Sequence, residues 1–272
     1  MAYDARPLLQ RLEMFEAIPP RATDALLGIL GDVREMAKGE SLREEGGPAA
    51  EFWLATEGWF FDSVRLTEGG RQVLTIYQSG DVMGLQDLGW DVAVCDTDAA
   101  TAGRIVRIEK RAFRDVVAEF PVLGSYFLTY GLYDHTRLID RLRVVGRMEA
   151  VRRVAHLLCQ VWADQAEPDP MPESGRFRFP LDQQLIGDAV GLTNISVSRM
   201  MGELERAGLI ERQGREVFVP DTEQLKSFCE FKERRRAVPL SWVLDPREGF
   251  VRPQAEPAHG HASRSAAGGQ AL

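Results

Sequence analysis

A short segment rich in hydrogen-bonding side chains carries the clearest chemical signal in this 272-residue sequence. Four of its polar residues can donate or accept hydrogen bonds: Asn194, Ser196, Ser198 and Arg199. Apolar residues are interleaved with them at helical spacing, which predicts a helix with one buried face and one polar face. Side chains of these lengths reach base edges and phosphates. The pattern therefore predicts a helix that lies in the major groove of DNA.

The flanking sequence must position this helix. An apolar stripe upstream predicts a preceding helix that ends at Gly191, because glycine adopts the left-handed backbone conformation of a helix C-terminus at the lowest steric cost. Thr193 is a suitable N-cap for the polar helix. Two short apolar runs around Gln213 and Gly214 then predict a hairpin, the wing. The alternative is a helical hairpin that packs only against its own domain. The N-cap, the polar face and the wing together favour DNA binding.

Residues 181–220 resemble the C-terminal winged helix-turn-helix of the Crp/Fnr family of bacterial transcription regulators, and the resemblance extends over residues 10–235. The matching residues are Ile186, Gly187, Val190, Gly191, Thr193, Val197, Arg199, Leu204, Glu205, Gly208, Leu209 and Ile210. The resemblance implies a dimeric regulator that binds double-stranded DNA at a pseudo-palindromic site. It also implies contact with RNA polymerase.

The resemblance assigns DNA contacts to individual residues. In the family, the position held here by Arg199 contacts DNA, often at a guanine. Asn194 and Ile195 stand at base-reading positions that hold Arg or Glu in well-known members, so we expect a departure from the standard half-site. Asn194 can pair with adenine, and Ile195 can contact a thymine methyl group. The expected DNA-binding residues are Gln183, Gln184, Thr193, Asn194, Ile195, Ser196, Ser198 and Arg199.

The sequence pattern divides the chain into four segments and predicts an α+β fold. Residues 1–120 predict short helices and then an antiparallel, jelly-roll-like β-roll, because short β runs alternate with glycine-rich turns. This matches the family's sensor domain of the cyclic-nucleotide-binding type. Residues 121–146 predict one long helix, and residues 147–236 the winged helix-turn-helix domain. Residues 237–272 form a C-terminal extension that we expect to be largely disordered.

Finer expectations concern the DNA-binding domain. Residues 146–150 are the expected hinge, and residues 151–163 predict its first helix. Residues 164–176 contain prolines and acids and predict a solvated loop. Residues 222–236 predict a last helix with a basic end.

Apolar residues of the long helix recur at alternating spacings of four and three, which is typical of a coiled-coil seam. The predicted dimer interface is Leu128, Leu132, His135, Ile139 and Leu142. The alternative is that this stripe packs on the β-roll. We favour the dimer, because two helix-turn-helix units read half-sites about one helical turn apart. His135 is either a pH-sensitive or ligand-linked group or a packed residue with satisfied hydrogen bonds.

The candidate effector pocket is Gly84, Leu85, Gln86 and Asp87. In family members that bind cyclic AMP, this region carries Gly-Glu and a nearby Arg-Ser pair that holds the phosphate. This sequence has no arginine between Arg71 and Arg104, and five aspartates crowd the region: Asp81, Asp87, Asp91, Asp96 and Asp98. Carboxylates repel a phosphate, so we expect cyclic AMP not to bind in the usual way. The effector, if any, is left open.

Composition argues against several other classes of protein. Cys95, Cys159 and Cys229 lie far apart in the sequence, which predicts buried reduced thiols and neither an iron–sulfur cluster nor a metal site. Residues 33–110 contain no histidine to ligate a heme, so no cofactor is expected. No nucleophile–base set suggests an enzyme. No apolar run is long enough to span a membrane, and no signal peptide is recognisable, which predicts a cytoplasmic protein.

The charge balance leaves a second function open. The chain has a net charge of −8, and residues 181–220 hold four arginines against two aspartates and four glutamates. Basic residues before and after this segment could compensate: Arg147, Arg152, Arg153, Lys232, Arg234, Arg235 and Arg236. The alternative is a signalling adaptor that binds a protein partner through a degenerate β-roll and the C-terminal extension.

Overall fold

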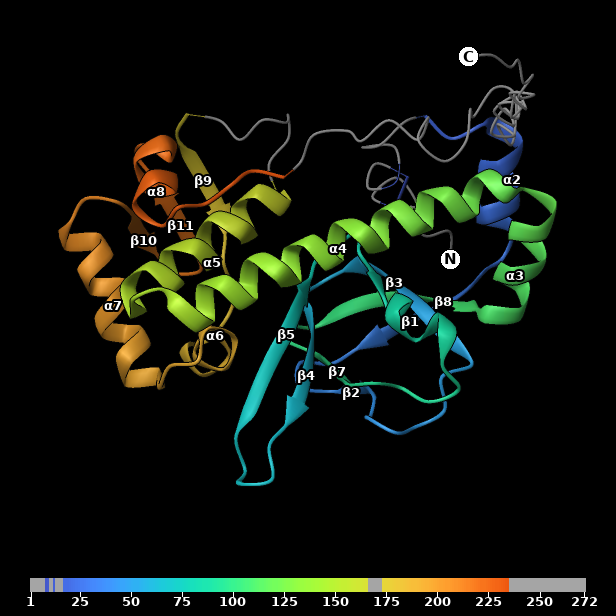
Figure 1. Cartoon of the computed structure of the whole chain (residues 1–272), viewed down its shortest axis with the longest axis horizontal. Helices are drawn as coiled ribbons and strands as arrows, with labels where there is room; N and C mark the ends of the chain where they lie inside the picture. Colours follow the sequence, from blue (N-terminus) through green and yellow to red (C-terminus); the bar gives the residue numbers. More distant parts are fainter. Residues whose placement is uncertain (1–7, 10–11, 13–16, 166–172, 235–272) are drawn as a thin grey trace, which may run out of the picture.

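The computed structural model describes residues 8–9, 12, 17–165 and 173–234. A β-roll and a winged helical domain lie side by side, and the helix α4 (Pro121–Arg147) runs along both of them (Figure 1). This arrangement confirms the predicted α+β fold class. The C-terminal extension, including residues 237–272, lies outside the described residues. None of the described helices is both long and apolar enough to cross a membrane.

Two four-stranded antiparallel sheets form the β-roll. The first sheet has the order β1 (Leu30–Met36), β8 (Gly103–Glu109), β3 (Glu51–Glu57) and β6 (Val82–Met83). The second has the order β2 (Ser41–Arg43), β7 (Asp96–Ala99), β4 (Phe60–Arg65) and β5 (Arg71–Tyr77). A short 3-10 helix, η1 (Leu85–Gly89), follows β6. The predicted antiparallel roll is therefore confirmed.

Helices close one side of the first sheet. The helices α2 (Pro20–Gly28) and α3 (Lys110–Glu119) lie beside the N-terminal end of α4 (Figure 1). Phe113 of α3 and Phe127 of α4 both meet Phe52 of β3 edge to face, with ring centroids 5.2 Å and 6.3 Å away. Leu123 and Tyr126 of α4 are fully buried in the same cluster. Apolar burial therefore fixes α4 on the roll over its first half.

The winged domain contains four helices and a three-stranded sheet among the described residues. The helices are α5 (Ala150–Gln165), α6 (Gln183–Val190), α7 (Asn194–Arg206) and α8 (Thr222–Phe228). The strands are β9 (Gly175–Arg178), β10 (Glu211–Gln213) and β11 (Glu216–Val219), in the order β10-β11-β9. The predicted helix-turn-helix and hairpin are present.

Two boundaries differ from the sequence prediction. The expected loop over residues 164–176 was wrong at its end, because β9 starts at Gly175 and adds a third strand to the wing. The buried Phe177 of β9 stacks on Trp162 of α5 at 5.5 Å, which holds this strand. The expected last helix over residues 222–236 was too long. It ends at Phe228, and Glu230 then takes a positive φ of 52°, which stops helical hydrogen bonding.

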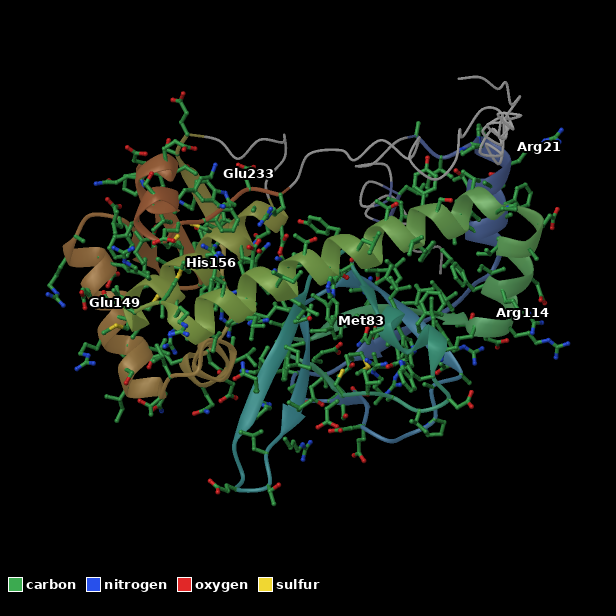
Figure 2. The ribbon with its side chains drawn as sticks, viewed as in Figure 1. Arg21, Met83, Arg114, Glu149, His156 and Glu233 are labelled. Carbon is green, nitrogen blue, oxygen red and sulfur yellow. The ribbon has the colours of Figure 1, made fainter. Side chains whose placement is uncertain are left out.

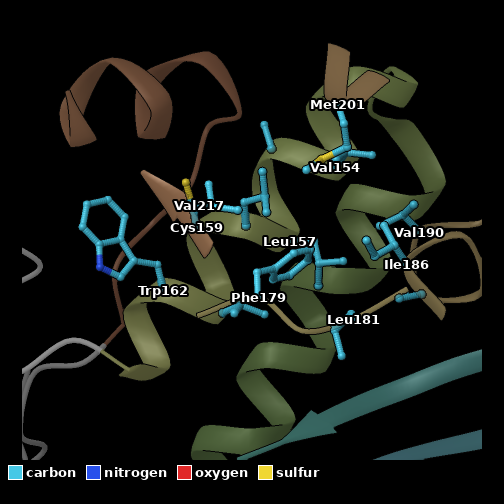
Figure 3. Packing of buried hydrophobic residues seen from close by; sticks show 14 of the residues in the cluster. Val154, Leu157, Cys159, Trp162, Phe179, Leu181, Ile186, Val190, Met201 and Val217 are labelled. Atoms are coloured by element: carbon cyan, nitrogen blue, oxygen red, sulfur yellow. The ribbon is translucent and has the colours of Figure 1, made fainter. Parts of the chain in front are cut away.

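The core of the winged domain continues into the roll. Val154 and Leu157 of α5 face Ile186 and Val190 of α6 in this cluster (Figure 3). Four large apolar residues of the roll join the same cluster: Trp59, Phe61, Val73 and Ile76. The two domains therefore share an apolar contact, which resists their separation.

Only Met148 and Glu149 separate α4 from α5, inside the hinge expected at residues 146–150. Two ion pairs away from this junction link α4 to the winged domain. Arg137 of α4 reaches Asp164 of α5 at 2.6 Å, and Asp140 of α4 accepts two hydrogen bonds from Arg234, each 3.0 Å long.

Candidate nucleic-acid interface

Local hydrogen bonds set the geometry of the helix-turn-helix. The side chain of Asp182 caps α6 by accepting from the Leu185 N–H at 2.9 Å. Gly191 ends α6 with a φ of 69°, a conformation that favours glycine. Thr193 Oγ1 caps α7 by accepting from the Ser196 N–H at 3.2 Å. The predicted Gly191 terminus and Thr193 cap are both present.

A second glycine sets the distance between the two helices. A Cβ added to Gly187 of α6 would lie 2.4 Å from the carbonyl oxygen of Leu192, closer than such atoms approach. The turn residue Leu192 can therefore cross α6 only where the side chain is a hydrogen atom. This close crossing fixes the angle at which α7 leaves the turn.

The polar face of α7 points away from the domain core. Val197, Met200, Met201 and Leu204 are buried, whereas Thr193, Asn194, Ile195, Ser198 and Arg199 are exposed and Ser196 is half-buried. Ile195 is 79% exposed, which is unusual for a large apolar side chain that serves only the fold. Arg199 forms no ion pair with the part of the chain that the structure describes. The structure thus gathers the residues expected to read DNA on one accessible face.

Gln183 and Gln184, the other two expected contacts, lie exposed in the first turn of α6. Gln184 donates to Asp188 at 2.8 Å, and Asp188 is held by Arg71 of β5 at 2.7 Å. Gln183 is the exposed first residue of α6, and backbone N–H groups at a helix N-terminus favour a phosphate.

Several carboxylates near α7 are paired with arginine or lysine. Asp188 binds Arg71, Asp182 lies 3.4 Å from Lys38, and Arg212 donates two hydrogen bonds to Glu205. These hydrogen bonds lower the pKa of Glu205 below its usual range. The acidic count of residues 181–220 therefore overstates the negative charge available to repel DNA.

The expected supply of basic residues needs correction. Arg234 is committed to Asp140, Arg152 lies 3.4 Å from Glu230, and Arg153 donates to backbone carbonyls. Arg152 and Arg234 are therefore paired with carboxylates, and Arg153 is turned toward the junction of the two domains. Arg147 stays exposed at the end of α4, and Arg235 and Arg236 lie outside the described residues.

The predicted seam of α4 is exposed along its length. Leu128, Leu132, His135, Ile139 and Leu142 all lie on the surface, and so does the neighbouring Leu138. The alternative, in which this stripe packs on the β-roll, is therefore wrong. The opposite side of α4 covers the roll and α5 instead.

The candidate effector region is filled by a buried polar network. Arg43 of β2 is ion-paired with Asp87 and donates to Thr97 at 2.8 Å. Its Nη2 atom also lies 3.6 Å from Asp62. A Cβ at Gly84 would lie 3.0 Å from Arg43, so the glycine makes room for the guanidinium. The expectation of a carboxylate pocket without an arginine was therefore wrong, because Arg43 reaches the site from an earlier strand.

Neighbouring side chains complete this network. Asp62 accepts hydrogen bonds from Gln86 at 2.6 Å and from Tyr77 at 2.8 Å. Burial raises the pKa of the Tyr77 hydroxyl well above its usual range, so the phenol stays protonated as a donor. Burial also raises the pKa of Cys95 to about 12, helped by the charge of Asp62. Leu85, the remaining candidate, packs on the apolar core.

Two cysteines that are distant in the sequence meet in the fold. The sulfur atoms of Cys159 on α5 and Cys229 after α8 lie 3.7 Å apart, and both side chains are buried and reduced. Burial raises the pKa of Cys159 well above its usual range, so it carries a thiol and not a thiolate. Among the described residues, no group of three or more His, Cys, Asp and Glu side chains could hold a metal ion.

Family models match both domains. A model of the cyclic nucleotide-binding domain matches residues 33–120, and a model of the Crp-like helix-turn-helix domain matches residues 152–228. The chain is 24% identical over 227 residues to the CRP-like cAMP-activated global transcriptional regulator of Mycobacterium tuberculosis, a match that covers 80% of this chain and 96% of the relative. It is 29% identical over 170 residues to the nitrogen fixation regulation protein FixK of Rhizobium meliloti, over 60% of this chain and 71% of the relative.

Solved structures share the fold over most of the chain. FixK2 from Bradyrhizobium japonicum superposes with a TM-score of 0.65 at 20% identity, covering 72% of this chain and 96% of that structure. The c-di-GMP responsive regulator CLP of Xanthomonas campestris superposes with a TM-score of 0.59 at 14% identity, covering 74% and 99%. The fold, the helix-turn-helix and these matches define a DNA-binding regulator of transcription. The chain belongs to the Crp/Fnr family.

Proposed function

We propose that this regulator acts as a homodimer, paired through α4, and that each α7 binds one half of a pseudo-palindromic DNA site. The proposed DNA contacts are Gln183, Gln184, Thr193, Asn194, Ile195, Ser196, Ser198 and Arg199. The observation that carries the proposal is the outward face of α7, where Arg199 is exposed and Ile195 is 79% exposed over a fully packed inner face.

The seam on α4 supports the dimer. A row of large apolar side chains on one helix face is costly in water and is buried when a second copy packs against it. A twofold axis along α4 places the same face of both helices together, so each seam residue contributes twice. Two α7 helices related by this axis then match a DNA site of the same symmetry.

We also propose that cyclic AMP does not control this protein in the usual way. The buried guanidinium of Arg43 is already paired with Asp87 and lies near a second carboxylate, Asp62. A cyclic phosphate entering this network would have to displace a carboxylate from Arg43 and would face the carboxylate that it displaced. The network supports a roll held together without a nucleotide at these residues.

Selection from random duplex DNA with the full-length protein tests the proposal. We expect an enriched motif with twofold symmetry. Replacing Arg199 with Ala should weaken binding to that motif by about 1–3 kcal/mol for each half-site, or roughly five- to 150-fold, because a base contact is lost. Relaxed specificity at one position of each half-site should accompany the loss.

The matched control is Arg114→Ala, which removes the same charge at the end of the molecule far from α7 (Figure 2). This variant should bind the selected DNA as the parent does. If no symmetric motif is enriched, or if both variants lose the same affinity, the proposed interface is wrong. Contact with RNA polymerase and the adaptor function stay predictions.

A further inference from the structure

A pocket of about 60 Å³ lies where the roll meets the winged domain. It is bounded by β5, the second half of α4, the inner face of α5 and the C-terminal end of α6. Apolar walls come from Leu74, Leu138, Val145 and Leu157. Since α4 and α5 are joined only by Met148 and Glu149, the pocket sits at the hinge of the molecule. It is separate from the polar network of Arg43 inside the roll.

The pocket holds more positive than negative charge. Three arginines and two aspartates line it: Arg137, Arg141, Arg153, Asp134 and Asp164. Arg137 takes both carboxylates, with Asp164 at 2.6 Å and Asp134 at 3.5 Å. The other two arginines have no carboxylate within ion-pair distance among the described residues. One positive charge is therefore left in excess in a partly desolvated place.

Backbone carbonyls satisfy these two arginines only in part. Arg141 donates to the carbonyl of Leu74 in β5 and, at 3.3 Å, to that of Ala189 in α6. Arg153 donates to the carbonyls of Met148 at 2.7 Å and Val190 at 3.4 Å. A guanidinium has five N–H donors, so each retains donors that none of these bonds uses. Burial, and then the charge of Arg137, lowers the pKa of Arg141 to about 10, which marks a cation lacking a counter-ion.

The two guanidinium groups line the same pocket and reach the same end of α6. Their acceptors in α6, Ala189 and Val190, are consecutive carbonyls at the C-terminal end of that helix. We propose that this pocket binds a small organic monocarboxylate, with its carboxylate held by Arg141 and Arg153 and a short apolar body against the leucine walls. A carboxylate matches the planar fork of a guanidinium. It also cancels one charge, whereas a phosphate monoester brings nearly two.

A ligand here would change the contact between the domains, and this part of the inference rests on the proposed function. Arg141 bridges the roll and α6 by bonding to one carbonyl in each. A carboxylate on the unused N–H groups of Arg141 attracts the guanidinium more strongly than a neutral carbonyl does, so binding shifts the balance between bridged and released arrangements of α6. The site would therefore couple a metabolite to the placement of α7.

Titration calorimetry on the full-length protein tests the pocket without DNA. The probes are acetate, butyrate and benzoate, with 1-butanol as an uncharged control and inorganic phosphate as an anion of another class. We expect saturable binding of at least one carboxylate and none of 1-butanol. No saturable carboxylate binding, equal binding of 1-butanol, or tighter binding of phosphate would each overturn the proposal.

Variants locate the site. Replacing Arg141 with Met should weaken carboxylate binding at least about tenfold, which is about 1.4 kcal/mol. Arg141→Lys keeps the charge and should bind with a smaller loss. The matched control is Arg143→Met on the same helix, where the arginine lies 3.6 Å from Glu230 and outside the pocket. Equal loss in the 141 and 143 variants would place the ligand elsewhere and end the proposal.

A separate measurement tells this inference from the proposed function. DNA affinity is measured with and without the tightest carboxylate probe, for the parent and for Arg141→Met. A change in the parent that disappears in the variant supports coupling through the pocket. Carboxylate binding by a protein that ignores every DNA sequence would refute the proposed function and leave the pocket intact.

Discussion

Replacing Leu142 with Ala should weaken the dimer strongly, because this residue is 77% exposed and is the last apolar residue of the α4 seam. Full burial of a leucine side chain contributes about 1.5–3 kcal/mol, so the part lost on truncation is about 1–2 kcal/mol per copy. A twofold axis doubles this to about 2–4 kcal/mol in the dimer, or roughly 30- to 1,000-fold in the dissociation constant. DNA binding should fall with it, since a monomer reads one half-site.

Sedimentation equilibrium over a range of protein concentrations measures the dissociation constant directly. The matched control is Leu66→Ala, because Leu66 is 57% exposed but lies on the turn after β4, away from α4. The control should dissociate as the parent does. The reasoning fails if the parent is monomeric at micromolar concentration, or if Leu142→Ala and Leu66→Ala shift the dissociation constant equally.

Two further predictions concern stability. Burial, and then the charge of Arg143, lowers the pKa of His156 to about 4, so the unfolded state takes up the proton at a higher pH than the folded state does. The free energy of unfolding should therefore fall by up to about 3 kcal/mol as the pH drops from about 6.5 to about 4. Thermal melts of His156→Gln should lack this pH dependence. Gly187→Ala should lower the melting temperature and abolish DNA binding, because the added Cβ would lie 2.4 Å from the Leu192 carbonyl oxygen. At Gly202 of α7 an added Cβ meets nothing within 4 Å, so Gly202→Ala should instead raise the free energy of unfolding by about 0.5–1 kcal/mol. A pH slope that persists without His156, or an unchanged Gly187→Ala protein, would contradict these two arguments.

The helix-turn-helix was predictable because its signals are local. Gly191 and Thr193 act on backbone atoms within a few residues, so the sequence alone locates the end of α6 and the start of α7. The exposed seam of α4 is also local, since helical periodicity follows from residue spacing. The seam faces outward because the opposite side of α4 is buried, where Tyr126 and Phe127 pack on the roll.

Long-range partners escaped the sequence prediction. Arg43 is separated from Asp87 by four strands along the chain. The pairing of β2 with β7 sets Arg43 beside Thr97, and the ion pair with Asp87 of η1 forms only in the folded roll. Likewise β9 was hidden, because GRFR is too short to stand out until β11 pairs with it. Cys159 and Cys229 met through the packing of α5 against α8. In each case the contact joins segments that are distant in the sequence, and no local pattern of residues indicates which distant segments will meet.

The net charge was also a poor guide to the DNA surface. A count treats every carboxylate as free, yet Asp188, Asp182 and Glu205 are paired with Arg71, Lys38 and Arg212. The same pairing consumed the arginines expected to supply positive charge, such as Arg234. The charge of the surface that faces DNA depends on which carboxylates and which arginines remain unpaired, and the fold decides that.

The contacts between the domains indicate how a signal would reach DNA. Among the described residues, every hydrogen bond and ion pair from the roll to the helix-turn-helix ends on α6 or its N-cap: Arg71 and Gln72 bind Asp188, Gln72 also reaches Ala189, and Lys38 lies near Asp182. The contact of Gly187 with the turn then couples α7 to α6. A shift of β5 therefore moves α6 first, and α7 follows because the turn has no room to adapt. We therefore predict that regulation acts through the β5–α6 contact, beside which the arginine pocket lies.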